Sequence, residues 1–484
     1  MLARYTTPQS RQRDGTTRPR YAEHEMPRDL TVLIMAAGHG TRMRSALPKV
    51  LHPVCGRPMI DWVVGAARDA GAGRVVCITR PGEGVDEYLA GAVEVAPQLE
   101  GEGTGSAVLA AREAIESAGT VAVMSGDHPL MTADVVRELV ATHERDGAGA
   151  TMLTTDTLDP RGYGRVVRAA DGTIERVVET KDEAGVPPEV LAIREINIGT
   201  YAFDPAQLLS ALDEVGETGG ERYLTDVVAI LRSRGRPIAA HLTADSLAAV
   251  NVNNRADLMR IEQLARERIL REHALAGVTF TSPASVAIDA DVRIGEDTVI
   301  GPGVSLHGHT HIGGGCRIGP NVTATEATIG DGATVLHAVL VDCAIGDRAS
   351  VGPFAYIRPG TTLGDGAKAG TYVEIKNSSI GAGAKVPHLS YVGDADVGEN
   401  ANLGASTITA NYDGQNKHRT AVGSGARTGV HTSLVAPVTV GDGAYTGAGA
   451  VVRKNVPEGA LSVSRAEQRI YENYKKRKED DSSR

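Results

Sequence analysis

The spacing of hydrophobic residues divides the chain into an alternating part, a helical part and, beyond residue 276, a repeating part. Over residues 30–240, short apolar runs such as Val75–Thr79 and Val121–Met124 alternate with turns and amphipathic stretches. This alternation predicts an α/β domain. Residues 254–276 follow a helical period instead, with a stripe formed by Leu258, Ile261, Ala265 and Ile269. We therefore expect a helix that connects the α/β domain to a second domain.

Beyond this helix, residues suited to a core recur at every sixth position. Three runs of this repeat contain Ile288, Ile294, Ile300, Leu306, Ile312 and Ile318; Ile345, Val351, Ile357, Leu363 and Ala369; and Val422, Thr428, Leu434, Val440 and Thr446. Six residues make one short strand and one turn, so three repeats close one coil of a parallel β-helix. A glycine-rich β-sandwich is the alternative, but the strict period over many repeats favours the β-helix.

The composition fits this division and excludes some functions. Glycine supplies 57 of 484 residues while aromatic residues are only 4%, as expected for a core of small and β-branched side chains. The net charge of −10 argues against a general nucleic-acid or membrane-surface binder. No apolar stretch approaches the ~18 residues that cross a bilayer. Four cysteines without metal-ligand spacing, Cys55, Cys77, Cys316 and Cys343, indicate a reduced cytoplasm.

The two ends of the chain differ from the rest. Residues 1–28 are rich in arginine and lack an apolar core, so we expect a disordered extension and not a secretory signal. Met26, just before the first predicted strand, is an alternative start. Residues 465–484 form a charged tail, expected to be helical and then disordered.

A glycine-rich turn follows the first predicted strand, Thr31–Ala37. Gly38 and Gly40 lie in this turn, and Arg42 and Lys49 come shortly after it. Such a turn exposes backbone N–H groups, and glycine lets a phosphate approach them closely. Many turns contain two glycines for steric reasons alone. The two cations beside this one favour a triphosphate site.

Asp127 follows another predicted strand, Val121–Met124. An aspartate in this position is often only a strand-end cap or a turn residue. Ligands gather at the carboxyl ends of parallel strands, however, and this location favours a functional role for the carboxylate.

These motifs carry a family resemblance. The run Ala36-Ala37-Gly38-x-Gly40-Thr41-Arg42-Met43 with Pro48-Lys49 resembles the signature of sugar-1-phosphate nucleotidyltransferases. With the hexapeptide half, residues 30–465 resemble the bifunctional N-acetylglucosamine-1-phosphate uridylyltransferase/glucosamine-1-phosphate N-acetyltransferase family. Further motifs match in order: Gly103-Thr104-Gly105, Gly126-Asp127, Gly162-Tyr163-Gly164-Arg165, Val178-Glu179, Glu195-Ile196-Asn197-x-Gly199, Tyr223-Leu224-Thr225-Asp226 and Val252-Asn253-Asn254-Arg255.

The resemblance implies a fold and its boundaries. An α/β Rossmann-like uridylyltransferase domain would span residues 29–254, and a linker helix residues 255–277. A left-handed parallel β-helix with the acetyltransferase site would span residues 278–464. The family also implies a homotrimer that acts on UTP, sugar-1-phosphates and acetyl-CoA, without nucleic acid or membrane.

The resemblance further implies roles in uridyl transfer. Asp127 and Asn253 would hold Mg²⁺, and Lys49 and Arg42 would face the triphosphate. The remaining nucleotide and sugar contacts would come from Met35, Ala36, Ala37, Gly38, Gln98, Gly103, Thr104, Ser125, Gly126, Gly164, Glu179 and Asn197. An oxygen of the sugar phosphate would attack the α-phosphorus of UTP with no general base, because a phosphate is already anionic. The chain departs from the family at Ser106, where histidine is common, and at Ser125, where tyrosine is common.

Polar residues in the β-helix half carry the second resemblance. The runs 387–394 and 408–414 look like acetyltransferase signatures. His388 would be the general base that takes a proton from the attacking amine, although a lone histidine is often only a capped turn residue. Arg358, Lys376, Tyr391, Asn402 and Lys417 would bind the sugar phosphate, and Ala405, Asn411, Tyr412, Val430, Ala448 and Arg465 would line the acetyl-CoA path. Val430 departs from the family, which often has serine there.

Two other functions compete with the bifunctional enzyme. A monofunctional nucleotidyltransferase could use its β-helix only as an oligomerisation scaffold, but it would not need His388 or the loop with Asn411 and Tyr412. A non-catalytic regulatory protein would not need Lys49 or Asp127. All of these residues are present.

Overall fold

The computed structural model describes residues 29–178, 180, 185–217, 219–464 and 468–473. The chain forms two compact units. The α/β unit runs up to His52 and continues over Pro58–Asp257, and the β-helix unit contains Pro53–Arg57 and the chain from Leu258 onward. The predicted extension 1–28, and most of the predicted tail 465–484, lie outside the described residues.

The α/β unit is organised around one mixed sheet in the order β11-β7-β10-β6-β1-β4-β5, with β8 and β9 attached through β10. Its strands are β1 Leu30–Met35, β4 Arg74–Thr79, β5 Glu94–Pro97, β6 Thr120–Ser125, β7 Ala150–Thr155, β8 Arg165–Arg168, β9 Ile174–Val178, β10 Ile196–Phe203 and β11 Ile238–Leu242. Strands β6, β1, β4 and β5 are parallel, whereas β10 runs antiparallel to both its neighbours. The predicted strands near residues 31, 75 and 121 are confirmed, although β1 ends at Met35 and not at Ala37.

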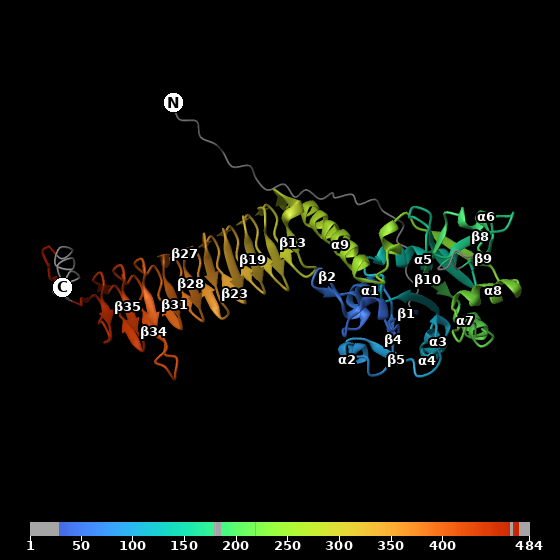
Figure 1. The fold of residues 1–484 in the computed structure, drawn as a ribbon, viewed down its shortest axis with the longest axis horizontal. Coiled ribbons are helices and arrows are strands. Elements are labelled where there is room, and N and C mark those ends of the chain that lie inside the picture. The colour runs from blue at the N-terminus through green and yellow to red at the C-terminus, as the bar shows by residue number, and fades with distance from the viewer. Residues whose placement is uncertain (1–28, 179, 181–184, 218, 465–467, 474–484) are drawn as a thin grey trace, which may run out of the picture. The chain divides into compact units, whose positions relative to one another are not determined.

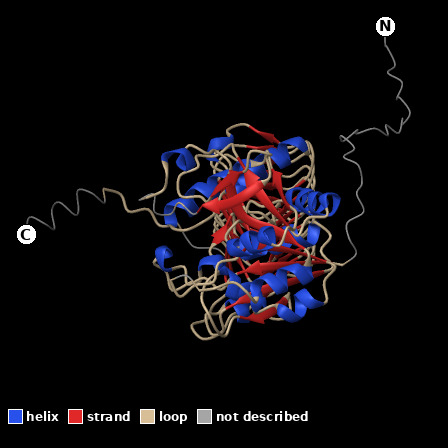
Figure 2. Ribbon diagram, turned by 90° about the vertical axis from the view of Figure 1, so that its right-hand side faces the viewer, coloured by secondary structure: helices blue, strands red, loops and turns tan. Residues whose placement is uncertain are grey.

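Helices cover the sheet on both faces, as the strand pattern requires. Along β1, Val32 and Ile34 belong to one buried hydrophobic cluster while Leu33 belongs to another, so both faces of the sheet are buried from solvent. The helices are α1 Met59–Asp69, α2 Val85–Leu89, α3 Thr104–Leu109, α4 Arg112–Glu116, α5 Ala133–Asp146, α6 Pro188–Leu191, α7 Pro205–Leu212 and α8 Thr225–Ser233, with 3₁₀ turns at Thr41–Met43, Lys49–Leu51 and Ser246–Ala249. Figure 2 shows the strands in red among these helices in blue.

The predicted connecting helix is α9, Arg255–Leu275. Of its predicted apolar stripe, Ile261, Ala265 and Ile269 are buried. A short hairpin, β2 Pro53–Val54 and β3 Arg57–Pro58, lies early in the sequence, but its residues 53–57 belong to the β-helix unit. The backbone N–H of Cys55 donates to Glu262 Oε2 at 2.7 Å, and Arg57 forms an ion pair with Asp291 at 2.5 Å.

The β-helix unit consists of three parallel sheets, which form its three faces. The first face contains β12 Thr279–Phe280, β15 Val299–Ile300, β18 Arg317–Ile318, β21 Thr334–Val335, β24 Ser350–Val351, β27 Lys368–Thr371 and β30 Lys385–His388. The second contains β13 Ala287–Ile288, β16 Ser305–His307, β19 Val322–Thr325, β22 Ala338–Val341, β25 Ala355–Ile357, β28 Glu374–Lys376, β31 Tyr391–Gly393, β33 Ile408–Ala410, β35 Ser433–Val435 and β38 Val451–Val452. The third contains β14 Arg293–Ile294, β17 His311–Ile312, β20 Thr328–Ile329, β23 Cys343–Ile345, β26 Thr361–Leu363, β29 Ser379–Ile380, β32 Ala395–Val397, β34 Thr420–Val422 and β36 Val438–Val440; β37 Tyr445–Thr446 pairs with β39 Leu461–Ser462.

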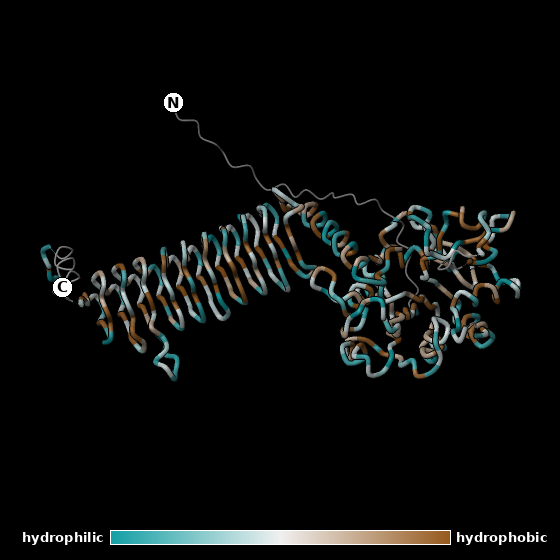
Figure 3. Tube along the Cα trace, in the orientation of Figure 1, coloured by the Kyte–Doolittle hydropathy of each residue, from teal (hydrophilic) through white to brown (hydrophobic). Residues whose placement is uncertain are grey.

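The six-residue repeat points inward, as predicted: every core position named for it is buried. Figure 1 shows the stacked coils, and Figure 3 shows hydrophobic positions recurring from coil to coil. The coils also explain why the first and second runs of the repeat, which end at Ile318 and begin at Ile345, are out of phase. Leu306 pairs with Ala324, eighteen positions on, but Ala324 pairs with Leu340 after only sixteen. The core register is therefore kept in space although the sequence period changes.

Candidate functional sites

A pocket of about 320 Å³ lies where β1, β4, β5 and β6 of the α/β unit end. Ten of the residues predicted for uridyl transfer line it: Met35, Ala36, Ala37, Gly38, Lys49, Gln98, Gly103, Thr104, Ser125 and Asp127. The carboxyl ends of parallel strands meet at one edge of a sheet, so segments far apart in sequence converge here. Gly126 stands behind the pocket, where its N–H donates to the carbonyl of Met35 at 2.9 Å.

The centre of the pocket is a buried ion pair. Lys49 Nζ lies 2.5 Å from Asp127 Oδ2, and the two side chains are only 16% and 10% exposed. Gly40 makes this approach possible: it has a φ of +58°, and a Cβ at this position would lie 2.7 Å from Lys49 Cβ. Burial would raise the pKa of Asp127, but the Lys49 ammonium, His128 and the hydrogen bonds from Lys49 and Ser125 outweigh it and lower the pKa. The carboxylate is therefore ionised.

The two predicted metal ligands lie near each other. Ser125 Oγ donates to Asp127 Oδ1 at 2.6 Å, and the N–H of Val252 donates to the carbonyl of Asp127 at 3.1 Å, which brings Asn253 beside the strand end. Asn253 Oδ1 accepts a hydrogen bond from Arg42 at 2.8 Å. Among the described residues, no group of three or more His, Cys, Asp or Glu could hold a metal. One carboxylate and one amide oxygen nevertheless fit Mg²⁺, which takes its other ligands from water and substrate phosphates.

Of the predicted sugar contacts, Gly164 and Asn197 lie among the described residues. Asn197 lies on β10, and its backbone N–H donates a hydrogen bond to the carbonyl of Gly164 at 2.9 Å, so these two residues are adjacent. The amide of Asn197 is fixed in turn, because Nδ2 donates to Tyr201 Oη at 2.7 Å and Oδ1 accepts from the N–H of Gly199. Neither residue lines the pocket described above. Glu179 lies outside the described residues.

One wall of the pocket is charged, and its residues are not among those predicted from the sequence. His39, Arg80, Glu102 and Glu221 line it beside the predicted residues. A signal for Arg80 was available, since it is the first residue after the predicted strand Val75–Thr79. Nothing in the sequence showed that Glu102 faces Arg80.

In the β-helix unit, the predicted phosphate-binding cations form a cluster at the end of β28. Lys376 lies against Lys417, and the contact between these two groups lowers the pKa of Lys376. Asp394 accepts hydrogen bonds from Asn377 at 2.6 Å and from Asn411 at 2.5 Å. Burial would raise the pKa of Asp394, but these bonds and the two lysines outweigh it and lower the pKa.

Two further predicted residues lie on the same face as this cluster. Asn411 Nδ2 lies 3.5 Å from Tyr391 Oη. Arg358 forms an ion pair with Glu374 at 2.7 Å, and Glu374 is in register with Tyr391 on the next coil. The cluster therefore combines cations with hydroxyl and amide groups, as a sugar phosphate requires.

His388 ends β30 at the corner between the first and second faces, and its side chain is exposed. Three predicted acetyl-CoA residues continue this corner through the following coils. The backbone N–H of Ser406, which follows Ala405, donates to the carbonyl of His388. On the next coil, the N–H of His431, which follows Val430, donates to the carbonyl of Ala405. On the coil after that, the N–H of Gly449, which follows Ala448, donates to the carbonyl of Val430. The predicted base therefore stands at one end of the predicted cofactor path.

The other predicted acetyl-transfer residues lie elsewhere. Asn402 is in register with Lys385 on the first face, on a different sheet from the cation cluster. Tyr412 is 60% exposed and pairs with Lys417 in the loop after β33. Arg465 lies outside the described residues.

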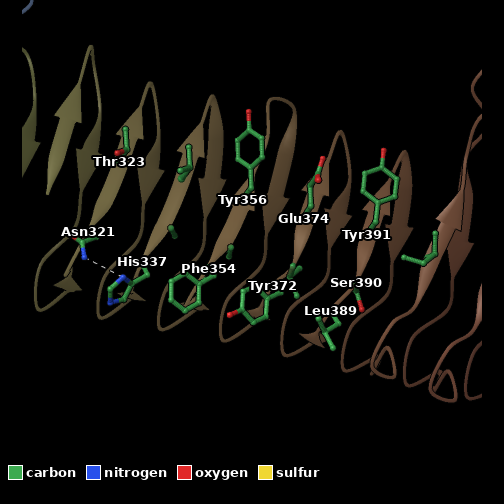
Figure 4. A pocket seen from close by; sticks show the side chains of 15 residues that line it. Asn321, Thr323, His337, Phe354, Tyr356, Tyr372, Glu374, Leu389, Ser390 and Tyr391 are labelled. Carbon is green, nitrogen blue, oxygen red and sulfur yellow. Dashed lines mark hydrogen bonds between the residues drawn. The ribbon is translucent and has the colours of Figure 1, made fainter. Parts of the chain in front are cut away.

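A hollow of about 720 Å³ over the second face has a stacked, exposed edge (Figure 4). His337, Phe354, Tyr372 and Leu389 follow one another from coil to coil, and the first three have ring centroids 5.3 Å apart at each step. We call these four residues the corner ladder. All four have φ between 43° and 59°. Phe354, Tyr372 and Leu389 are each more than half exposed, and Leu389 directly follows His388.

The fold and the pocket define a class: a nucleotidyltransferase unit followed by a hexapeptide-repeat β-helix. The model of the MobA-like NTP transferase domain matches residues 32–234, and the model of the bacterial transferase hexapeptide (six repeats) matches residues 291–326. No helix among the described residues is long and apolar enough to span a membrane.

Relatives identify the family within this class. The chain is 49% identical over 465 residues to the bifunctional protein GlmU of Mycobacterium tuberculosis, and the match covers 93% of each chain. It is 47% identical over 460 residues to the bifunctional protein GlmU of Streptomyces avermitilis, covering 93% of this chain and 95% of the relative. The chain belongs to the family of bifunctional GlmU proteins.

Proposed function

We propose that the two units catalyse two consecutive steps of UDP-N-acetylglucosamine synthesis. The β-helix unit transfers an acetyl group from acetyl-CoA to glucosamine-1-phosphate. The α/β unit then transfers a uridyl group from UTP to N-acetylglucosamine-1-phosphate and releases pyrophosphate. Family membership over 93% of the chain supports both activities, and the buried Lys49–Asp127 pair in a pocket at the strand ends is the observation that carries the second.

Uridyl transfer requires positioning and charge neutralisation. Lys49 and Arg42 would bind the triphosphate, while Asp127 and Asn253 would hold Mg²⁺. The bound ion would neutralise phosphate charge and leave the α-phosphorus open to attack. In the structure Lys49 and Arg42 contact Asp127 and Asn253 themselves, so the triphosphate would take over these cations and free oxygen ligands for the metal. The sugar phosphate needs no base, because its oxygen is already an anion.

Acetyl transfer requires a base, because the amine loses a proton when it attacks. The amine nitrogen bonds to the thioester carbonyl carbon and its proton passes to His388, while the C–S bond breaks and CoA leaves as the thiolate, which then takes up the proton. The exposed imidazole at the start of the Ala405–Val430–Ala448 corner supports this role. Lys376, Lys417 and Arg358 would hold the sugar phosphate.

We further propose that the active form is a homotrimer joined through the β-helix. An aromatic or branched side chain in the left-handed region costs roughly 1 kcal/mol or more. The exposed corner ladder therefore contributes little to the fold of a single chain, and association of copies would bury it. Asn402 lies on a different sheet from the cation cluster, as expected if a neighbouring copy completes the site. We also propose that the protein is a cytoplasmic enzyme. The four cysteines of the chain are free and buried, and its proposed substrates are cytoplasmic metabolites.

Product analysis tests the proposed function. The purified protein is incubated with glucosamine-1-phosphate, acetyl-CoA, UTP and Mg²⁺, and each component is omitted in turn. UDP-N-acetylglucosamine should form only in the complete mixture. N-acetylglucosamine-1-phosphate should bypass the need for acetyl-CoA. If uridyl transfer proceeds while glucosamine-1-phosphate is never acetylated, the monofunctional alternative is correct.

A further inference from the structure

Arg80 occupies a central place at the edge of the sheet. It directly follows β4, which lies between β1 and β5 in the parallel part of the sheet. The segments after these two neighbours, residues 36–40 and 98–104, provide the predicted uridine contacts. Both begin by pairing with the end of β4: the N–H of Ala36 donates to Ile78, and the N–H of Gln98 donates to Thr79, each at 2.8 Å.

The guanidinium of Arg80 contacts both segments. Nη2 donates to the two carboxylate oxygens of Glu102 at 3.1 and 3.0 Å, and Nε donates to the carbonyl of Ala37 at 3.4 Å. Glu83 lies farther off, at 3.8 Å. The side chain of Arg80 is 23% exposed, so solvent only partly screens these contacts. A rigid, forked donor suits such a bridge better than a single ammonium does.

The charge of Arg80 matters for an anionic ligand. Glu102 and Glu221 both line the pocket, and a triphosphate would enter beside their carboxylates. Arg80 neutralises Glu102 directly. Without it, the carboxylate would repel the nucleotide, and the segment that carries Glu102 would lose its tie to Ala37.

We propose that Arg80 is a positioning residue of the uridyl-transfer site, which sets the separation of the two uridine-binding segments. The inference rests on the proposed nucleotide site. Arg80 acts on how the nucleoside is held and does not touch the reacting phosphorus, so it governs the KM for UTP more than kcat.

The test compares Arg80→Met with Arg74→Met. Arg74 lies on the same strand and loses a similar ion pair, with Glu94, but it is not among the residues that line the pocket. We expect Arg80→Met to raise the KM for UTP about 10-fold, with kcat and the KM for N-acetylglucosamine-1-phosphate within about twofold. Arg74→Met should leave both KM values unchanged. Arg80→Lys, which keeps the charge but not the fork, should restore only part of the loss.

Three results would overturn the proposal. The KM for UTP in Arg80→Met could stay within twofold of the intact enzyme. Arg74→Met could raise it equally, which would indicate general loosening of the strand. Arg80→Lys could match the intact enzyme, which would reduce the role to charge. If the intact enzyme itself forms no uridyl product, the proposed function fails instead.

Discussion

Replacing Asp127 with Asn tests how much the buried ion pair contributes to the stability of the α/β unit and to uridyl transfer. At an effective dielectric constant of about 20, unit charges 2.5 Å apart attract by roughly 7 kcal/mol, and desolvation of both groups cancels much of this. The variant leaves the Lys49 ammonium buried without its counter-charge. Because Lys49 keeps some exposure, we expect a loss of about 3 kcal/mol, which lowers the Tm of the α/β unit by roughly 6–12 °C. Uridyl transfer should fall at least about 10²–10³-fold.

The assay measures thermal unfolding and both activities on the same samples. The double variant Lys49→Met/Asp127→Asn removes both charges, and we expect it to recover most of the lost stability but none of the uridyl transfer. Acetyl transfer should stay normal throughout, because its residues lie in the other unit. A folded Asp127→Asn variant that keeps more than about a tenth of its uridyl transfer would refute the assigned role of Asp127. Loss of acetyl transfer in the folded variant would refute the division into two sites.

Three further predictions follow from the β-helix and the buried thiols. His388→Ala should lower acetyl-transfer turnover about 10²–10⁴-fold while uridyl transfer and the Tm stay normal, and normal turnover would remove the histidine from the mechanism. Phe354→Asp should convert the assembly to smaller species in sedimentation, with loss of acetyl transfer but not uridyl transfer; an unchanged trimer would show that the corner ladder is not an interface. Burial raises the pKa of Cys55, Cys77 and Cys343 to about 12, so a disulfide reagent at pH 8 should react with them only after unfolding.

The sequence was sufficient for most of the fold because the core repeats are strict. The six-residue period located buried positions such as Ile300 and Leu434 correctly. It could not locate the left-handed corner residues, since aromatic side chains such as Phe354 and Tyr372 have no propensity for that backbone. It also could not show that β10 runs antiparallel, because strand direction depends on pairing partners that are distant in sequence.

The grouping of the candidate site residues was predictable where each follows a strand within a recognisable motif. Lys49 and Asp127 are 78 positions apart, yet each follows a strand of the parallel sheet, and the structure joins them directly. The contact between Arg80 and Glu102 was missed for a physical reason: Arg80 directly follows a predicted strand, but Glu102 is an ordinary charged residue in its local sequence. Only the order of β1, β4 and β5 in space brings them together.

Residues 53–57 belong to the β-helix unit although they come early in the sequence, and this affects how the protein can be divided into fragments. A fragment that starts at Leu258 would lack the hairpin residues, and Glu262 and Asp291 would lose their partners Cys55 and Arg57. Conversely, a fragment that ends before α9 would keep these residues without the surface on which they pack. No single cut yields two intact halves. To study the units separately, residues 53–57 should be grafted onto the second fragment, or the chain should be kept whole and one site inactivated by substitution.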